Sequence, residues 1–383
     1  MSVTAASGFR AAGVAAGLKG SGRPDLALVV NDGPSRTAAG VFTTNRVKAA
    51  PVLWSQQVLA AAEVTAVVLN SGGANACTGP AGFQDTHATA ERAADLLGHS
   101  AAEVAVCSTG LIGVRLPMER LLAGVETAVG ALSPQGGAAA AQAILTTDTV
   151  AKTAMVDGTG FTVGGMAKGA GMLAPSLATM LAVLTTDADV AADDLDRALR
   201  DASRATFERI DSDGCLSTND TVLLLASGAS GVTPSYEDLA RAVHDVSARL
   251  TRQLLADAEG ATKDISIAVH RAATEADAVQ VGRAVARSNL LKCAIHGGDP
   301  NWGRVLAAVG TTAAEFEPGR LAVAINGVWV CRDGGVGDDR DKVDLSGRDV
   351  SITVDLGAGG SEATVWTNDL TPGYVHENSA YST

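Results

Sequence analysis

The sequence predicts an α+β protein in which layers of sheet are covered by helices. Two observations predict this class. Apolar segments rich in β-branched residues, typical of strands, mix with amphipathic helical segments but follow no strict βαβ rhythm. Hydrophobic residues make up 46% of the 383 residues, which is enough for a large core spread over two or three domains.

Ten short apolar segments bounded by turn residues are predicted to be strands. They cover residues 26–31, 64–70, 104–107, 161–164, 180–185, 221–226, 265–270, 321–325, 350–356 and 363–367. Aromatic residues make up only 3% of the chain, whereas glycine occurs 43 times. We therefore expect small side chains to do much of the packing and glycines to supply many turns.

The clearest helix is predicted for residues 235–255, where apolar residues recur every three or four positions and so form one buried face. These residues are Leu239, Val243, Val246, Leu250 and Leu254. Ser235 is the expected N-cap, with Asp238 as the fourth residue of an imperfect capping box. Similar patterns predict helices at residues 85–97, 117–132, 193–210 and 274–295.

The charge of the chain argues against nucleic acid as its main partner. It has 29 Lys and Arg against 42 Asp and Glu, a net charge of −13, and no basic run. The longest uncharged stretch, residues 169–186, contains Pro175 and polar residues, so no membrane span is expected. The first 20 residues include Arg10 and lack a leucine-rich core, which argues against a secretory signal and for a cytoplasmic protein.

The sequence contains no recognisable metal-binding or cofactor-binding motif. The five cysteines are far apart and form no CxxC pair, a pattern that fits a reducing compartment. The six histidines are scattered, with no HExxH motif and no tight cluster with cysteines or carboxylates. The sequence also lacks a GxxxxGK[ST] phosphate loop and a GxSxG nucleophile motif. We therefore expect no metal and no cofactor.

The most informative segment is GGMAKGAGMLAPSLATMLAVLTTD, residues 164–187, in which a glycine-rich loop bearing Lys168 leads through Thr179 into an apolar strand. One interpretation is an ordinary turn before a buried strand. The other is a threonine nucleophile. A threonine hydroxyl needs a base, and cleavage of the chain just before Thr179 would supply one as its free α-amino group, whose pKa is near 8.

Eight ordered segments of this chain resemble the ornithine acetyltransferase (glutamate N-acetyltransferase) family, across nearly its whole length. They are NSGGANACTG (70–79), CSTGLIG (107–113), TTDT (146–149), KGAGMLAPSLATML (168–181), DGCLSTNDT (213–221), ADAEGATK (256–263), GDPNWGRV (298–305) and ENSAYST (377–383). Gly73 departs from the NSGNANACTG often seen in the family, and we expect it to be a loop glycine that affects no catalytic residue.

The resemblance implies a self-cleaving enzyme with an N-terminal threonine nucleophile. Cleavage between Ala178 and Thr179 would give an α chain of residues 1–178 and a β chain of residues 179–383. Thr109 and Gly110 match the pair that stabilises the oxyanion. A strand ending in Ser-Thr-Gly agrees with this role, since it places a hydroxyl and a backbone N–H at a strand end, although an ordinary strand-to-turn exit has the same pattern.

Besides Thr179, five residues match the substrate-contacting positions of the family, and each also has a purely structural interpretation. Thr146 could cap a helix, Lys168 could be a solvated loop charge, and Glu259 could face water. Asn378 and Thr383 lie in the last six residues, where fraying is the default. If they do line the site, the C-terminal tail must be docked against it.

The resemblance also sets the expected architecture and activity. We expect an αββα-type sandwich at residues 1–262 and a smaller α/β domain at 263–383, with turns near 259–261 and 297–303 as candidate boundaries. The implied reaction moves an acetyl group from N2-acetylornithine to glutamate in cyclic arginine biosynthesis, with acetyl-CoA as a possible second donor and an α2β2 or larger assembly. An N-terminal-nucleophile aminopeptidase or amidohydrolase and an uncleaved amino-acid-binding protein stay open as alternatives.

Overall fold

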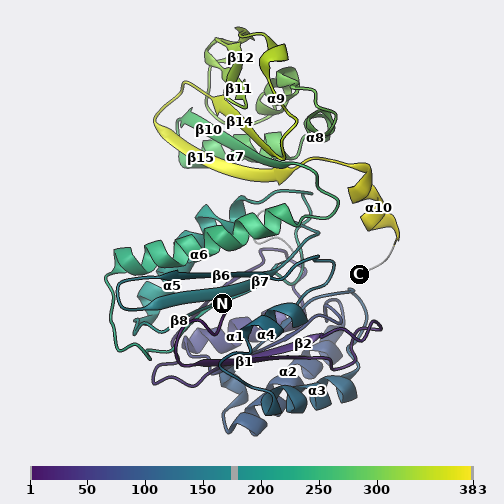
Figure 1. Cartoon of the computed structure of the whole chain (residues 1–383), viewed down its shortest axis with the longest axis vertical. Helices are drawn as coiled ribbons and strands as arrows, with labels where there is room; N and C mark the ends of the chain where they lie inside the picture. The colour runs from purple at the N-terminus through teal and green to yellow at the C-terminus, as the bar shows by residue number, and fades with distance from the viewer. Residues whose placement is uncertain (1, 174–179, 381–383) are drawn as a thin grey trace.

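The computed structural model describes residues 2–173 and 180–380. Two sheets lie face to face within a layered sandwich, and a third sheet lies beyond it (Figure 1). This arrangement confirms the predicted α+β class and the order of helix, sheet, sheet and helix. Among the described residues, no helix is long and apolar enough to cross a membrane.

The first sheet of the sandwich has the strand order β1-β2-β4-β5. Its strands are β1 (Phe9–Val14), β2 (Leu26–Asn31), β4 (Ala66–Asn70) and β5 (Val104–Ser108). Only β4 and β5 run parallel, and their register ends on the pair Asn70 and Ser108. Since parallel strands share their carboxyl ends, the chain leaves both strands at the same edge of the sheet.

The second sheet has the order β3-β9-β8-β7-β6. Its strands are β3 (Ala38–Phe42), β6 (Lys152–Asp157), β7 (Thr162–Lys168), β8 (Leu181–Thr186) and β9 (Thr221–Ala226). β7 and β8 are antiparallel neighbours in which Lys168 pairs with Leu181. This register places the end of β7 beside the start of β8, on either side of the predicted cleavage segment.

Helices cover both outer faces of the sandwich. The helices on the first sheet are α2 (Gly79–Leu97) and α3 (Met118–Gly130), and those on the second are α5 (Ala192–Ala205) and α6 (Tyr236–Ala256). The predicted apolar face of α6 is confirmed, because all five of its residues are at most 1% exposed. Ser235 caps α6 by accepting the backbone N–H of Asp238, as predicted.

Two short helices lie between the sheets (Figure 1). They are α1 (Ala50–Val58) and α4 (Gly137–Ala143). α4 contacts β1 and β2 on one side and β7 on the other, and α1 contacts β5 and β3. The alanine-rich sequence of α4 suits this place, because small side chains allow a helix to fit between two sheets.

The third sheet has the order β13-β12-β11-β14-β10-β15 and its own hydrophobic core. Its strands are β10 (Asp264–Ala272), β11 (Ala322–Ile325), β12 (Val328–Arg332), β13 (Gly335–Val336), β14 (Asp349–Asp355) and β15 (Ser361–Asn368). The helices that accompany it are α7 (Glu275–Ala286), α8 (Asn289–His296) and α9 (Trp302–Val309). The division into domains at residue 262 stays a prediction.

Two predicted helices are broken within their expected ranges. The helix expected at 274–295 is two helices, because Ser288 adopts an extended conformation and caps α8 through the N–H of Leu291. The helix expected at 193–210 ends at Ala205 and is followed by a short 3-10 turn, η3 (Phe207–Arg209). In both segments the helical spacing of apolar residues continues past the point where the helix ends, so hydrophobic periodicity alone does not reveal that end.

The C-terminal helix α10 (Pro372–Ala380) returns from the third sheet toward the sandwich (Figure 1). The hydroxyl of Thr371, just before the helix, donates to the carbonyl oxygen of Gly260 at 2.7 Å and accepts the N–H of Tyr374 at 2.9 Å. Gly260 has φ +63°, and a Cβ there would lie 2.2 Å from the Tyr374 nitrogen. A glycine is therefore required where α10 packs on the turn after α6.

Candidate active site

A polar cavity brings together six of the residues that the sequence predicts for the site. They are Thr109, Gly110, Thr146, Lys168, Glu259 and Asn378. Thr147, Gly171 and Met172 complete its lining and were not predicted. The other predicted residues, Ala178, Thr179 and Thr383, lie outside the described residues, so their roles stay predictions.

Thr109 and Gly110 are held at the carboxyl end of β5. The backbone N–H of Thr109 donates to the carbonyl oxygen of Asn70 at 2.9 Å, and Thr109 also forms an isolated bridge with Gly73. Gly73 therefore lies directly at the site rather than in a remote loop. Gly110 has φ +130°, and a Cβ there would lie 2.8 Å from the Gly73 nitrogen, so only glycine fits.

The backbone hydrogen bonds of Thr109 and Gly110 show which of their donor groups stay available to a ligand. The amide of Thr109 is already bonded to the backbone, so its hydroxyl is the donor that it has left. Within residues 2–173 and 180–380, the backbone N–H of Gly110 has no hydrogen-bond partner. One hydroxyl and one N–H on adjacent residues are the type of donor pair that holds a developing oxyanion.

Lys168, the last residue of β7, orients the Thr109 hydroxyl. Its ammonium donates to Thr109 Oγ1 at 3.1 Å, and the lysine is only 1% exposed. Because the oxygen accepts from Lys168, the hydroxyl hydrogen is free to donate elsewhere. Burial lowers the pKa of the Lys168 ammonium, and the nearby Asp148 carboxylate opposes this shift.

Asp148 holds the loops around Lys168 together. Its carboxylate accepts bonds from Lys152 Nζ at 2.6 Å, the N–H of Gly169 at 2.7 Å and the N–H of Thr146 at 3.0 Å. Burial alone would raise the pKa of Asp148, but Lys168 and Lys152 outweigh it and lower the pKa below its ordinary value. The sequence marked this residue only as part of the TTDT segment, because its burial depends on contacts distant in sequence.

Glu259 and Asn378 form another part of the cavity lining. Asn378 on α10 donates its side-chain N–H to Glu259 Oε2 at 2.9 Å. The backbone N–H of Glu259 donates to the Ala170 carbonyl oxygen at 2.9 Å, and a Cβ on Gly171 would lie 2.6 Å from the Glu259 carboxylate oxygens. Helix α10 therefore reaches the site through Asn378, and the Glu259 carboxylate faces the glycine-rich loop at Gly171.

Asp220 is a buried carboxylate near the same place that sequence reasoning missed. Its Oδ1 accepts the backbone N–H of Met180, the residue after Thr179, at 3.1 Å. Its Oδ2 is buried and has no partner in the described part of the chain. Burial raises the pKa of Asp220 well above its ordinary value. The carboxyl group anchors the start of β8 beside the end of β7.

The GDPNWGRV segment lines no part of this cavity. The side chain of Asn301 instead caps α9 by accepting the N–H of Arg304 at 3.3 Å. Among the described residues, no group of three or more His, Cys, Asp or Glu side chains could hold a metal ion. The cavity thus offers oxyanion donors, a buried cation and a carboxylate, which suit the two ends of a small polar molecule.

The α+β sandwich and its polar cavity fit an enzyme. The chain belongs to the ArgJ family, whose model matches residues 10–383. This confirms the family that the sequence motifs predicted.

Two curated relatives match over 100% of both chains, and both are called "Arginine biosynthesis bifunctional protein ArgJ". The protein from Streptomyces coelicolor is 72% identical to this chain, and the one from Thermobifida fusca is 66% identical. A crystal structure of ornithine acetyltransferase from Mycobacterium tuberculosis, complexed with ornithine, is 60% identical in sequence. It covers 45% of this chain and 94% of its own, with a TM-score of 0.43.

Proposed function

We propose that this chain is a glutamate N-acetyltransferase of arginine biosynthesis that moves the acetyl group of N2-acetylornithine to glutamate. The observation that carries the proposal is the contact of the buried Lys168 ammonium with the Thr109 hydroxyl, beside the N–H of Gly110, which has no partner among the described residues. This arrangement fits an oxyanion site close to the start of β8, the strand that follows the predicted nucleophile Thr179. Full-length relatives named as arginine biosynthesis proteins support the pathway.

The first step is proposed to be self-cleavage. The Thr179 hydroxyl attacks the carbonyl carbon of Ala178, the peptide C–N bond breaks, and the acyl group moves from nitrogen to oxygen. Water then hydrolyses the resulting ester, which leaves a carboxylate on Ala178 and a free amine and hydroxyl on Thr179. Met180, bonded to Asp220, and Leu181, paired with Lys168, support the proposal because they bring the chain after this bond to the cavity edge.

The second step is acetyl transfer through an acetyl-threonine intermediate. The Thr179 hydroxyl attacks the acetyl carbonyl of N2-acetylornithine while its own α-amine takes the proton. The Thr109 hydroxyl and the Gly110 N–H stabilise the tetrahedral oxyanion. Ornithine leaves with the proton, and the amine of glutamate then attacks the acetyl ester, which restores the hydroxyl. The kinetics are therefore ping-pong.

The charges around the cavity suit these substrates. We propose that the Glu259 carboxylate holds an ammonium group of ornithine and that Lys168 adds positive charge near the substrate carboxylate. Thr146 and Asn378 line the same cavity, and Thr383 completes the substrate site in this proposal. Solvent screens charges beyond about 8 Å at physiological salt, so Lys168 can act locally despite the net charge of −13.

A denaturing gel with Thr179→Ala tests the cleavage. Wild type should give two fragments of roughly 18 and 20 kDa, in proportion to their lengths within 38.5 kDa. Thr179→Ala should stay whole and transfer no acetyl group, while Thr179→Ser, which keeps a hydroxyl, should still be cleaved. A Thr179→Ala protein that splits or transfers would overturn the proposal.

Assays of acetylornithine with and without glutamate separate transfer from hydrolysis. A transferase forms acetylglutamate and releases little acetate when glutamate is absent, whereas a hydrolase releases acetate at full rate without it. Acetyl-CoA belongs in a third arm, since the relatives are called bifunctional and we propose it as a second donor. We also propose a cytoplasmic location and an α2β2 or larger assembly.

A further inference from the structure

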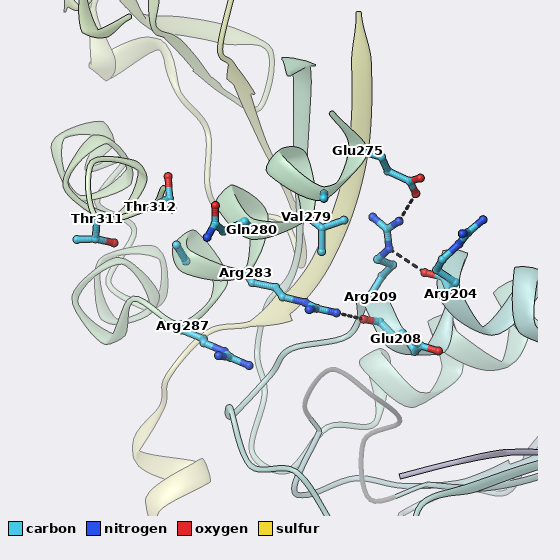
Figure 2. A pocket seen from close by; sticks show the side chains of 12 residues that line it. Arg204, Glu208, Arg209, Glu275, Val279, Gln280, Arg283, Arg287, Thr311 and Thr312 are labelled. Carbon is cyan, nitrogen blue, oxygen red and sulfur yellow. Dashed lines mark hydrogen bonds and ion pairs between the residues drawn. The ribbon is translucent and has the colours of Figure 1, made fainter. Parts of the chain in front are cut away.

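A second pocket lies between the end of α5 with η3, helix α7, and the turn after α9 (Figure 2). It shares no lining residue with the candidate active site. Four of its twelve lining residues are arginines, namely Arg204, Arg209, Arg283 and Arg287. Only Glu208 and Glu275 oppose them in the lining, although the whole chain carries a net charge of −13. The lining itself therefore carries more guanidinium than carboxylate groups, unlike the acidic chain as a whole.

Two of the arginines are already engaged with carboxylates. Arg209 is buried, donates from Nη2 to Glu275 at 2.5 Å and from Nε to the Arg204 carbonyl oxygen at 2.8 Å. Arg287 donates from Nε to the buried carboxylate of Asp211 at 2.7 Å. These bonds fix the two sides of the pocket and use the charge of both guanidinium groups.

Arg283 differs from these two because no carboxylate of the described residues hydrogen-bonds to it. Its side chain extends from α7 toward η3 (Figure 2), and Nη2 donates to the backbone carbonyl oxygen of Glu208 at 3.2 Å. Its Nε is buried and has no partner within the described chain. Arg204 is also weakly satisfied, since it reaches the exposed Asp201 at 3.5 Å only. Apart from the Nη2 bond, the terminal N–H groups of Arg283 have no acceptor among the described residues, and an anion in the pocket would supply one.

We propose that this pocket binds a small dianionic oxyanion, either a phosphate group or a dicarboxylate, through Arg283 and Arg204. Oxygens of such an anion match the planar donor fork of a guanidinium, and the Gln280 amide lines the same space. The hydroxyls of Thr311 and Thr312 donate to backbone carbonyls of α9, so they accept rather than donate here.

The two glutamates of the pocket do not prevent this. Glu275 is bonded to Arg209, which offsets its charge. Burial raises the pKa of Glu208, although the surrounding arginines oppose that shift, so burial disfavours its charged form. Val279 supplies an apolar part of the lining, which leaves room for the carbon skeleton of an organic anion.

Calorimetric titration of the full purified protein tests the site, with inorganic phosphate and succinate as probes at constant ionic strength set by NaCl. We expect saturable binding of at least one probe at millimolar concentration or below. Binding of phosphate alone points to a phosphate-bearing ligand, and binding of succinate alone points to a dicarboxylate. No saturable binding of either probe would overturn the proposal.

Three variants show whether the arginines of this pocket are responsible. Arg283→Gln should weaken binding about tenfold or more, because it removes a charge-assisted hydrogen bond to the anion. Arg204→Gln changes a largely exposed side chain and should weaken binding several-fold. Arg92→Gln removes the same charge from α2, where Arg92 pairs with Glu126, and should leave binding unchanged. Equal affinity in wild type, Arg283→Gln and Arg204→Gln would contradict the proposal.

Discussion

Replacing Thr109 by valine tests the proposed oxyanion site most sharply. Valine has nearly the same shape, so the packing of this residue, which is 2% exposed, is kept while the hydroxyl is lost. Two effects follow from the contacts. The cavity loses the donor that the Lys168 bond leaves free, and the buried Lys168 ammonium loses its acceptor at 3.1 Å.

The two effects have different sizes and different readouts. Loss of one oxyanion donor lowers kcat by about 10²- to 10³-fold, which corresponds to about 2.7–4 kcal/mol of transition-state stabilisation. Loss of an acceptor for a buried charge lowers the free energy of unfolding by about 1–3 kcal/mol. The first is measured as kcat for acetylglutamate formation per mole of cleaved protein, and the second by urea unfolding.

Thr109→Ser is the matched control because it keeps the hydroxyl. We expect it to retain kcat within about tenfold of wild type, since serine loses only a methyl group and gains rotamer freedom. A Thr109→Val protein that is cleaved normally and keeps kcat within about threefold of wild type would refute the assignment of this hydroxyl.

Three further predictions concern neighbouring groups. Gly110→Ala places a Cβ 2.8 Å from the Gly73 nitrogen at φ +130°. We therefore expect the free energy of unfolding, measured with urea, to fall by about 1–3 kcal/mol and kcat to fall as well. Wild-type values of both quantities would contradict the proposed backbone strain. Glu259→Gln should raise KM for acetylornithine about tenfold and change KM for glutamate less, because the proposed ammonium contact is lost. Equal changes in the two KM values would contradict this contact. Burial raises the pKa of Asp211 to about 6 in the folded protein, despite the nearby Arg287. Because this pKa is higher than in the unfolded chain, the folded protein becomes less stable as the pH rises from about 4 to about 6. The free energy of unfolding of Asp211→Asn, measured with urea, should therefore rise by about 2.4 kcal/mol relative to wild type between pH 4 and pH 7.5. A difference between the two proteins that does not change with pH would contradict this prediction.

The sequence predicted elements best where local pattern and burial agree. The strand at 221–226 has the predicted bounds, and the apolar face of α6 is buried as its spacing requires. Strands β1 and β3, FRAAGV and AAGVF, were missed because their alanines and glycines have low strand propensity, and pairing with neighbouring strands decides their conformation instead.

The site was predicted through the motifs, whereas the charges that organise it were not. Thr109, Lys168 and Glu259 are brought into one cavity from three distant parts of the chain. Asp148 and Asp220 stood inside two of the quoted motifs without a role, because a carboxylate in a polar segment is normally solvated. Only the tertiary structure shows that both are buried next to Lys168 and Met180.

The central claim is that a free N-terminal Thr179 carries the acetyl group, and intact-mass measurement tests it most directly. The purified protein is measured before and after brief mixing with N2-acetylornithine in the absence of glutamate. We predict two fragments, with Thr179 at the start of the second, and a gain of about 42 Da on that fragment alone, which glutamate removes. An active protein that is found as one chain of 38.5 kDa, or that carries the acetyl group elsewhere, would contradict the account.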